Sequence, residues 1–206
     1  MRGSSPRRSQ RISKRRRRQR WQQLPVSDLR SPTELISYCK QAVESVDERQ
    51  KEQLIDAILT SRRIFIYGSG RSGLIGQLFA VRLVQLGFDV HFVGEMTTPI
   101  ITKDDLTLLI SYTGRTSSVV QTAEIAKRIG SKVISLTGTK DCNLSKTSDT
   151  TVLFDIIDNE ETSKIAPLGT IFEDSAHLFF ECVVCDIMNK QKITEEDMRN
   201  RHAIWV

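Results

Sequence analysis

Two short segments of the chain combine glycine with hydroxyl side chains and could bind a phosphate group. The first, Gly68-Ser-Gly-Arg-Ser-Gly73, follows an apolar run of β-branched and aromatic residues at 64–67. The second, Ser111-Tyr-Thr-Gly-Arg-Thr116, follows the apolar run 106–110 and precedes a helical pattern. A glycine turn between a strand and a helix points backbone N–H groups and the positive end of the helix at an anion. Both segments therefore predict an anion site.

The first segment alone leaves the kind of anion open. Gly68-x-Gly70-x-x-Gly73 is formally a dinucleotide fingerprint, and Glu95 follows at about the 20-residue distance of a ribose-binding acid. The second segment favours a monophosphate, because its three hydroxyls exceed what an ordinary helix cap requires. In a sheet of order 2-1-3-4-5 the two loops would share one crevice. We therefore expect a phosphorylated ligand, with a dinucleotide as the weaker alternative.

Strand and helix patterns alternate from residue 63 onward. We expect strands at 63–67, 89–93, 106–110, 132–136 and 151–154, and helices at 73–86, 117–129, 142–147 and 171–189, with a last short helix from Thr194. A capping box at Ser31–Glu34 and a second start near Asp47 predict a pair of helices before the first strand. This alternation is typical of an α/β fold, a doubly wound five-stranded parallel sheet of flavodoxin-like order 2-1-3-4-5.

The positive charge is concentrated at the N-terminus. Residues 1–20 contain ten Arg or Lys and no acidic residue, and the rest of the chain has 20 basic and 25 acidic residues. We expect 1–30 to be a disordered basic tail and 31–206 to be one folded domain. The tail composition fits a nucleic-acid or nuclear-localisation patch, a transit peptide, or a segment without a chemical role, which we favour. The acidic remainder argues against nucleic-acid binding by the folded domain.

Composition and spacing also argue against membrane, disulfide and metal chemistry. No apolar run approaches the roughly 20 residues that span a membrane. No signal peptide precedes the four cysteines, so a disulfide framework is not expected. Cys182-x-x-Cys185 has metal or redox spacing but no second pair, and we expect both cysteines to pack on a buried helix face. No His, Cys, Asp and Glu cluster has metal spacing, so we expect no metal.

Five segments of the sequence, in order, resemble the 6-phospho-3-hexuloisomerases, a family of the sugar isomerase (SIS) domain. They are Gly68–Gly73, Val93–Pro99, Ser111–Thr116, Pro167–Glu173 and Arg201-His202, and the likeness extends over roughly residues 32–206. The chain departs from the family at Met96, where a Thr is usual. It has Thr113 where the family often has Ser, which keeps the hydroxyl.

The resemblance implies isomerisation of D-arabino-3-hexulose 6-phosphate and D-fructose 6-phosphate through an enediol, by side-chain acid/base catalysis and without a cofactor. Glu173, at the start of a helix, is the expected base. His202 is the second candidate, and in the family such a C-terminal His can approach a neighbouring subunit's site. The expected substrate-binding residues are Gly70, Arg71, Ser72, Glu95, Thr97, Thr98, Ser111, Thr113, Arg115 and Thr116.

Two other functions stay open. One is another SIS aldose–ketose isomerase, for example one acting on arabinose 5-phosphate. The other is a non-catalytic sugar-phosphate sensor, which would need neither Glu173 nor His202. The resemblance further implies a homo-oligomer, often a tetramer, with a sugar-phosphate substrate and a functional link to a hexulose-6-phosphate synthase. It also implies a cytoplasmic place in the ribulose monophosphate pathway, in the direction of formaldehyde fixation or of pentose synthesis.

Overall fold

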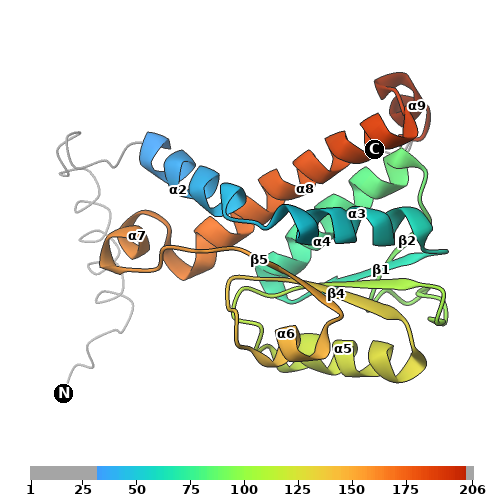
Figure 1. Cartoon of the computed structure of the whole chain (residues 1–206), viewed down its shortest axis with the longest axis horizontal. Helices are drawn as coiled ribbons and strands as arrows, with labels where there is room; N and C mark the ends of the chain where they lie inside the picture. The colour runs from blue at the N-terminus through green and yellow to red at the C-terminus, as the bar shows by residue number, and fades with distance from the viewer. Residues whose placement is uncertain (1–31, 203–206) are drawn as a thin grey trace, which may run out of the picture. The chain divides into compact units, whose positions relative to one another are not determined.

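The computed structural model describes residues 32–202, so the predicted basic tail at 1–30 and the last four residues lie outside the described part. One domain over 31–206 stays a prediction. Five parallel strands form one sheet in the order β2-β1-β3-β4-β5 (Figure 1). They are β1 (Ile64–Gly68), β2 (Val90–Phe92), β3 (Leu106–Ile110), β4 (Lys132–Thr137) and β5 (Thr150–Leu153). The predicted α/β fold and strand order are confirmed.

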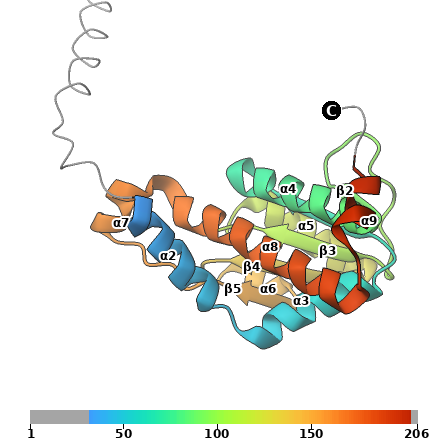
Figure 2. The ribbon, with the colours of Figure 1, turned by 90° about the horizontal axis from the view of Figure 1, so that it is seen from above.

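Helices cover both faces of the sheet (Figures 1 and 2). One face carries α3 (Glu48–Thr60) and α4 (Gly70–Leu86), with α8 (Thr170–Gln191) packed on both, and the other carries α5 (Ser117–Ile129) and α6 (Asn143–Thr147). The remaining helices are α2 (Pro32–Glu44), α7 (Glu160–Ile165), the 3₁₀ turn η2 (Pro167–Gly169) and α9 (Glu195–Asn200).

The core is divided between the two faces. The larger cluster includes Ile66, Leu108 and Ile110 of the sheet, and Phe79 of α4 stacks on Phe180 of α8 with ring centroids 3.9 Å apart. The smaller cluster joins Leu109 of the sheet to the buried side chains of α5 and α6. A sheet buried on both faces explains why its strands are continuous apolar runs without alternation.

Several helix boundaries follow local sequence signals. Asp47 caps α3 by accepting a hydrogen bond from the Arg49 N–H at 2.7 Å. Gly87, at φ 99°, ends α4. Thr194 and Asp197 form the reciprocal capping box of α9 that the sequence predicts. These helix ends depend on residues that are close together in the sequence. They can therefore be predicted without knowledge of the tertiary structure.

Three sequence predictions are wrong in detail. Helix α7 lies in a stretch predicted as loop, because only Thr162 of its residues is buried and no apolar period marks it. Cys182 and Cys185 are exposed, since α8 buries the neighbouring face that carries Phe179 and Val183. The spacing of Leu35, Ile36 and Cys39 predicts one apolar face for the first helix, but Ile36 is 65% exposed.

A buried ion pair joins the starts of β1 and β3. The Asp105 side chain is fully buried and accepts hydrogen bonds from Arg63 Nε at 3.1 Å and Nη2 at 2.9 Å. It also accepts from the Thr102 N–H at 2.7 Å and the Thr102 hydroxyl at 2.9 Å. Burial raises the pKa of the Asp105 carboxyl, but the donors from Arg63 and Thr102 together outweigh burial, so the pKa lies below its usual range.

Candidate active site

The first glycine segment forms the junction of β1 and α4. A Cβ on Gly73 would lie 2.5 Å from the Gly68 carbonyl oxygen, so these glycines let the helix approach the strand. The sequence analysis starts the helix at residue 73, whereas α4 begins at Gly70 and includes Arg71 and Ser72 in its first turn. The pattern of apolar residues does not indicate this first turn, because the turn contributes no large apolar side chain to the core.

Glu173 meets the first turn of α4. It lies in the first turn of α8, is 9% exposed, and forms an ion pair with Arg71. The Ser72 hydroxyl donates to Glu173 Oε1 at 3.3 Å, and Arg71 Nη2 also donates to the Thr170 hydroxyl at 3.3 Å. The structure thus brings together a predicted base and two predicted binding residues, about one hundred positions apart in the chain.

The second segment lies beside the first, because β1 and β3 are neighbours and Gly68 pairs with Ile110. Ser111 is 4% exposed, and its hydroxyl lies 3.3 Å from that of Thr116, the N-cap of α5. The Thr113 hydroxyl accepts from the Arg115 N–H at 3.4 Å. The three hydroxyls therefore gather at the start of α5, where the helix dipole favours an anion.

The turn in this second loop depends on Gly114. Its φ is +59°, and an added Cβ would lie 2.1 Å from the buried Cys142 sulfur. Gly70 has the same φ of +59° but no heavy atom within 4 Å of an added Cβ. The two glycines thus share a conformation and differ in packing.

Gly114→Ala is expected to destabilise the protein by about 1–3 kcal/mol more than Gly70→Ala, because only the first adds a clash to the left-handed strain. Urea unfolding of both variants measures the difference. Equal losses would mean that Cys142 moves aside without cost.

Tyr112, which the sequence analysis did not select, joins this loop to the segment before α8. Its hydroxyl donates to Asp158 Oδ2 at 3.0 Å, and its ring lies 5.3 Å from that of Phe172. Burial and the adjacent Asp158 carboxylate raise the pKa of Tyr112 to about 12, so it stays a donor at neutral pH. The only available signal was an aromatic residue within a hydroxyl-rich loop.

A cavity of about 420 Å³ opens next to Tyr112. Thr113 lines one side, and Leu168 and Gly169 line another. Leu168 has a left-handed backbone, with φ 60°, and its side chain is 91% exposed. Strained residues of this kind cluster at binding sites. The cavity places room for a small ligand between the hydroxyl loop and the segment that leads to Glu173.

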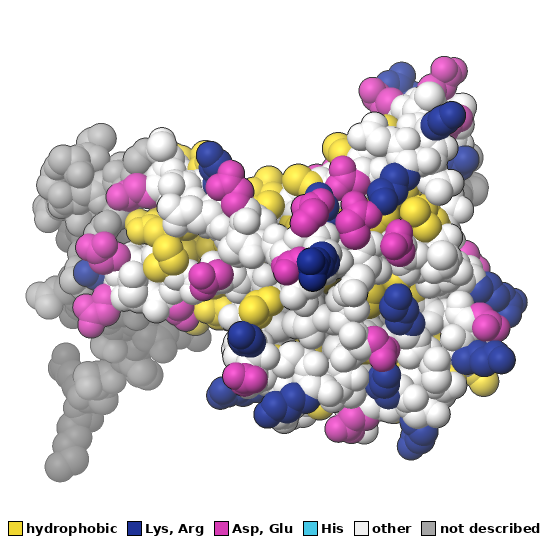
Figure 3. Space-filling model, in the orientation of Figure 1, with side chains coloured by type: hydrophobic (Ala, Val, Ile, Leu, Met, Phe, Trp, Pro, Cys, Tyr) yellow, Lys and Arg dark blue, Asp and Glu magenta, His cyan; other side chains and the backbone are white. Residues whose placement is uncertain are grey.

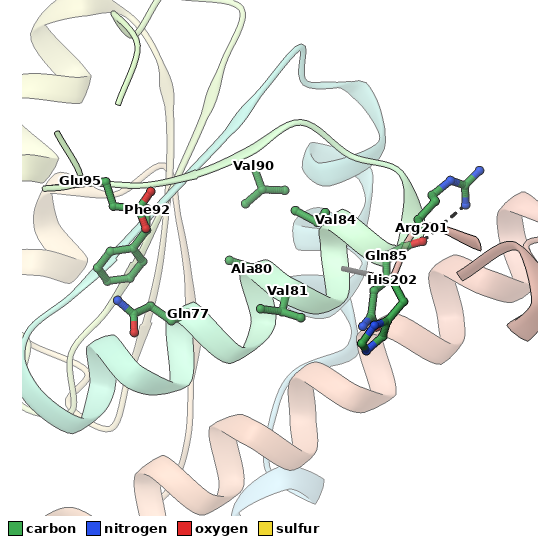
Figure 4. A pocket seen from close by; sticks show the side chains of 10 residues that line it. All are labelled: Gln77, Ala80, Val81, Val84, Gln85, Val90, Phe92, Glu95, Arg201 and His202. Carbon is green, nitrogen blue, oxygen red and sulfur yellow. Dashed lines mark hydrogen bonds between the residues drawn. The ribbon is translucent and has the colours of Figure 1, made fainter. Parts of the chain in front are cut away.

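The loop after β2 carries three of the predicted binding residues. The Thr98 hydroxyl donates to the carbonyls of Phe92 at 3.1 Å and Glu95 at 2.7 Å, so it closes a turn. Thr97 is exposed. Glu95 lines a separate groove of about 740 Å³ with Arg201 and His202 (Figure 4).

His202 does not join Glu173 within one chain. Arg201, its neighbour, donates to the Gln85 carbonyl at 3.4 Å, at the last turn of α4, whereas Glu173 contacts the first turn. About 14 helical residues separate these turns, or roughly 20 Å at 1.5 Å per residue. Within one chain, Glu173 and His202 therefore lie near opposite ends of α4.

Residues 32–202 contain neither a metal-ligand cluster nor a membrane-spanning helix. No group of three or more His, Cys, Asp or Glu in that range could hold a metal ion. None of the helices there has the length and apolar content of a membrane-spanning segment.

Comparison with known proteins gives a family model and several relatives that match most of the chain. The family model described as SIS domain matches residues 57–173. A Methanocaldococcus jannaschii protein named 3-hexulose-6-phosphate isomerase is 42% identical over 153 residues, which are 74% of this chain and 82% of that protein. A Bacillus subtilis protein of the same name is 32% identical over 174 residues, with 82% and 94% covered.

Solved structures also have a similar fold. A hypothetical protein from Methanococcus jannaschii, from whose crystal structure a molecular function of 3-hexulose-6-phosphate isomerase was inferred, superposes with a TM-score of 0.75. It is 37% identical, and the match covers 84% of this chain and 96% of that chain.

Proposed function

The chain belongs to the SIS domain family, and from this membership we propose that it isomerises D-arabino-3-hexulose 6-phosphate and D-fructose 6-phosphate. Relatives that carry the name of this isomerase over most of their length support the reaction. The observation that carries the proposal is the buried Glu173 carboxylate, which Arg71 and Ser72 hold while the ring of the adjacent Phe172 lies 5.3 Å from that of Tyr112 in the hydroxyl loop 111–116. A carboxylate beside a phosphate site is what proton transfer on a sugar phosphate requires.

The substrate phosphate binds the loop after β3 in this proposal. Ser111, Thr113 and Thr116 donate hydroxyl hydrogen bonds, and the N–H groups at the start of α5, that of Arg115 among them, add to the positive end of the helix. The sugar extends past Tyr112 toward Glu173.

Glu173 transfers the proton that the isomerisation requires. It takes the proton from C2, beside the C3 carbonyl, and the electron pair forms the 2,3-enediol while O3 takes up a proton from water. O2 then gives its proton back to water as the carbonyl forms at C2, and C3 takes up the proton from Glu173. Reactants and products have the same composition, so no redox partner enters the sequence.

Arg71 stabilises the negative charge that develops on the sugar oxygens. Its side chain is 46% exposed although it pairs with Glu173, so a ligand can reach the guanidinium. A cation fixed where charge develops lowers the barrier without reorganising water. The proposed role is electrostatic, and Ser72 positions the Glu173 carboxylate.

His202 takes part, in this proposal, from a second subunit of a homo-oligomer. It lies at the opposite end of α4 from Glu173 in its own chain. Apolar side chains also reach the surface of α4 and α8, among them Leu74 at 63% exposed and Leu178 at 47%. Figure 3 shows apolar side chains exposed on one face of the molecule. We propose that such surfaces join copies of the chain, with a tetramer as the expected assembly.

Mixing two inactive variants tests this arrangement. Glu173→Gln and His202→Gln subunits, each inactive alone, are expected to regain part of the activity when they are refolded together, because hybrid assemblies contain complete sites. Activity of a strictly monomeric protein, or no recovery in proven hybrids, would contradict the proposal.

A coupled assay tests the reaction itself. Formaldehyde, ribulose 5-phosphate and a hexulose-phosphate synthase supply the substrate, and fructose 6-phosphate is measured. Turnover by the protein supports the proposal. Fructose 6-phosphate binding that Ser111→Ala weakens, without turnover, would favour the sensor, and turnover of arabinose 5-phosphate alone would favour the other isomerase.

The proposal includes a metabolic setting. Its substrate is the product of a hexulose-phosphate synthase, so we propose a functional link to that enzyme in the ribulose monophosphate pathway. Sugar phosphates are handled in the cytoplasm, where we expect the protein to act. Detection of the protein in a cell fraction that lacks sugar phosphates would contradict the proposed place of action.

A further inference from the structure

The groove beside α4 has apolar walls. It runs between α4 and β2, and its volume is about 740 Å³ (Figure 4). Val81 and Val84 of α4 line it and are 53% and 45% exposed, and Val90 and Phe92 of β2 face them. Strand β2 is at the edge of the described sheet, a position that proteins commonly cover. An apolar occupant is therefore expected here.

The described chain ends in this groove. His202 and Arg201 line one end of it, and Arg201 Nη1 donates to the Gln85 and Leu86 carbonyls at 3.4 and 3.5 Å. The sequence continues with Ala203-Ile-Trp-Val206, in which three of four side chains are large and apolar. The chain therefore delivers an apolar tetrapeptide to the end of an apolar groove.

The length of this segment matches the length of the groove. Four extended residues reach about 14 Å. The groove follows α4 from Gln85 to Gln77, which is about 12 Å at 1.5 Å per residue. Gln77 and the exposed Glu95 lie at the far end of the groove.

We infer that Ala203–Val206 docks in the groove of its own subunit, with the Trp205 indole against the apolar walls, and thereby fixes His202. A buried indole supplies the largest contact area of any side chain in the segment. The inference is independent of the isomerase reaction, because it rests on the groove, the composition of the segment and its length.

Tryptophan fluorescence of the full-length chain tests the docking. The chain has two tryptophans, so Trp21→Phe leaves Trp205 as the only one. Trp205 is expected to emit at shorter wavelength than a solvated indole and to resist acrylamide. Val81→Asp, which puts a charge in the wall, is expected to shift the emission to the red and raise the quenching constant several-fold. Ile125→Asp on α5, at a residue 39% exposed and outside the groove lining, is the matched control and is expected to change neither.

Three results would overturn the inference. Trp205 could be quenched as fast as free tryptophan in the Trp21→Phe protein. Val81→Asp and Ile125→Asp, both shown to be folded by circular dichroism, could give the same emission. A red shift of the Trp205 emission when the protein is diluted would instead mean that the groove binds residues 203–206 of a second copy.

Discussion

Replacing Glu173 with Gln is expected to lower kcat about 10²- to 10⁴-fold, the usual contribution of one acid–base group. The amide keeps the size of the side chain and an acceptor for the Ser72 hydroxyl, but it cannot take a proton from carbon. The coupled assay measures the loss. Fructose 6-phosphate is expected to bind the variant, because the hydroxyls of Ser111, Thr113 and Thr116 are unchanged.

Asp174→Asn is the matched control for this variant. Asp174 is the next residue of α8 and carries the same charge, but it is exposed. Its replacement removes one negative charge from the same helical turn without touching the site, so kcat is expected to stay within a few-fold of the parent. Equal losses in the two variants would indicate a general electrostatic effect, and full activity of Glu173→Gln would remove Glu173 from the mechanism.

Replacing Asp105 with Ala is expected to destabilise the protein by about 3–5 kcal/mol, because it leaves a mostly buried guanidinium without its carboxylate. The Arg63 side chain is only 11% exposed, and the Thr102 N–H loses its acceptor as well. Urea unfolding at neutral pH measures the loss. Glu195→Ala is the control, since it breaks a pair that is at least 74% exposed on both sides and that contributes little.

The Asp105 effect is also expected to depend on pH. The folded protein lowers the pKa of this carboxyl, so its ionised form stabilises the fold fully above the unfolded value of about 3.9. The contribution disappears as the pH falls through the lower pKa of the folded state. The difference between the parent and Asp105→Ala should therefore shrink in acid, and a constant difference would contradict the role of the charge.

The sequence predicts the framework of this protein better than its site. Helix α5 begins and ends where Thr116 and Gly130 predict, and the strand order follows from βαβ alternation. Glu173, Ser72 and Ser111 could be selected because their loops carry recognisable chemistry. The ion pair between Arg71 and Glu173 could not be predicted in this way, because it depends on how the first turns of two helices far apart in the sequence pack together.

The same reason explains the other discrepancies. The sequence identifies Thr98 as a hydroxyl in a candidate loop, but only the three-dimensional turn shows that this hydroxyl is used locally. His202 carries suitable chemistry, and only the course of α4 shows that it lies near the opposite end of this helix from Glu173. Cys182 and Cys185 are apolar enough to be buried, and the choice of face on α8 rests on larger neighbours such as Phe179.

Helix α4 has one further consequence, which is thermodynamic. Its first turn carries Arg71 and Ser72 at the ligand site, and its last turns form the wall of the C-terminal groove. A ligand that favours one position of the helix changes the free energy of docking at the other end, and linkage makes that effect reciprocal. Sugar-phosphate affinity measured with and without residues 203–206 gives this coupling energy directly, and identical affinities would set it to zero.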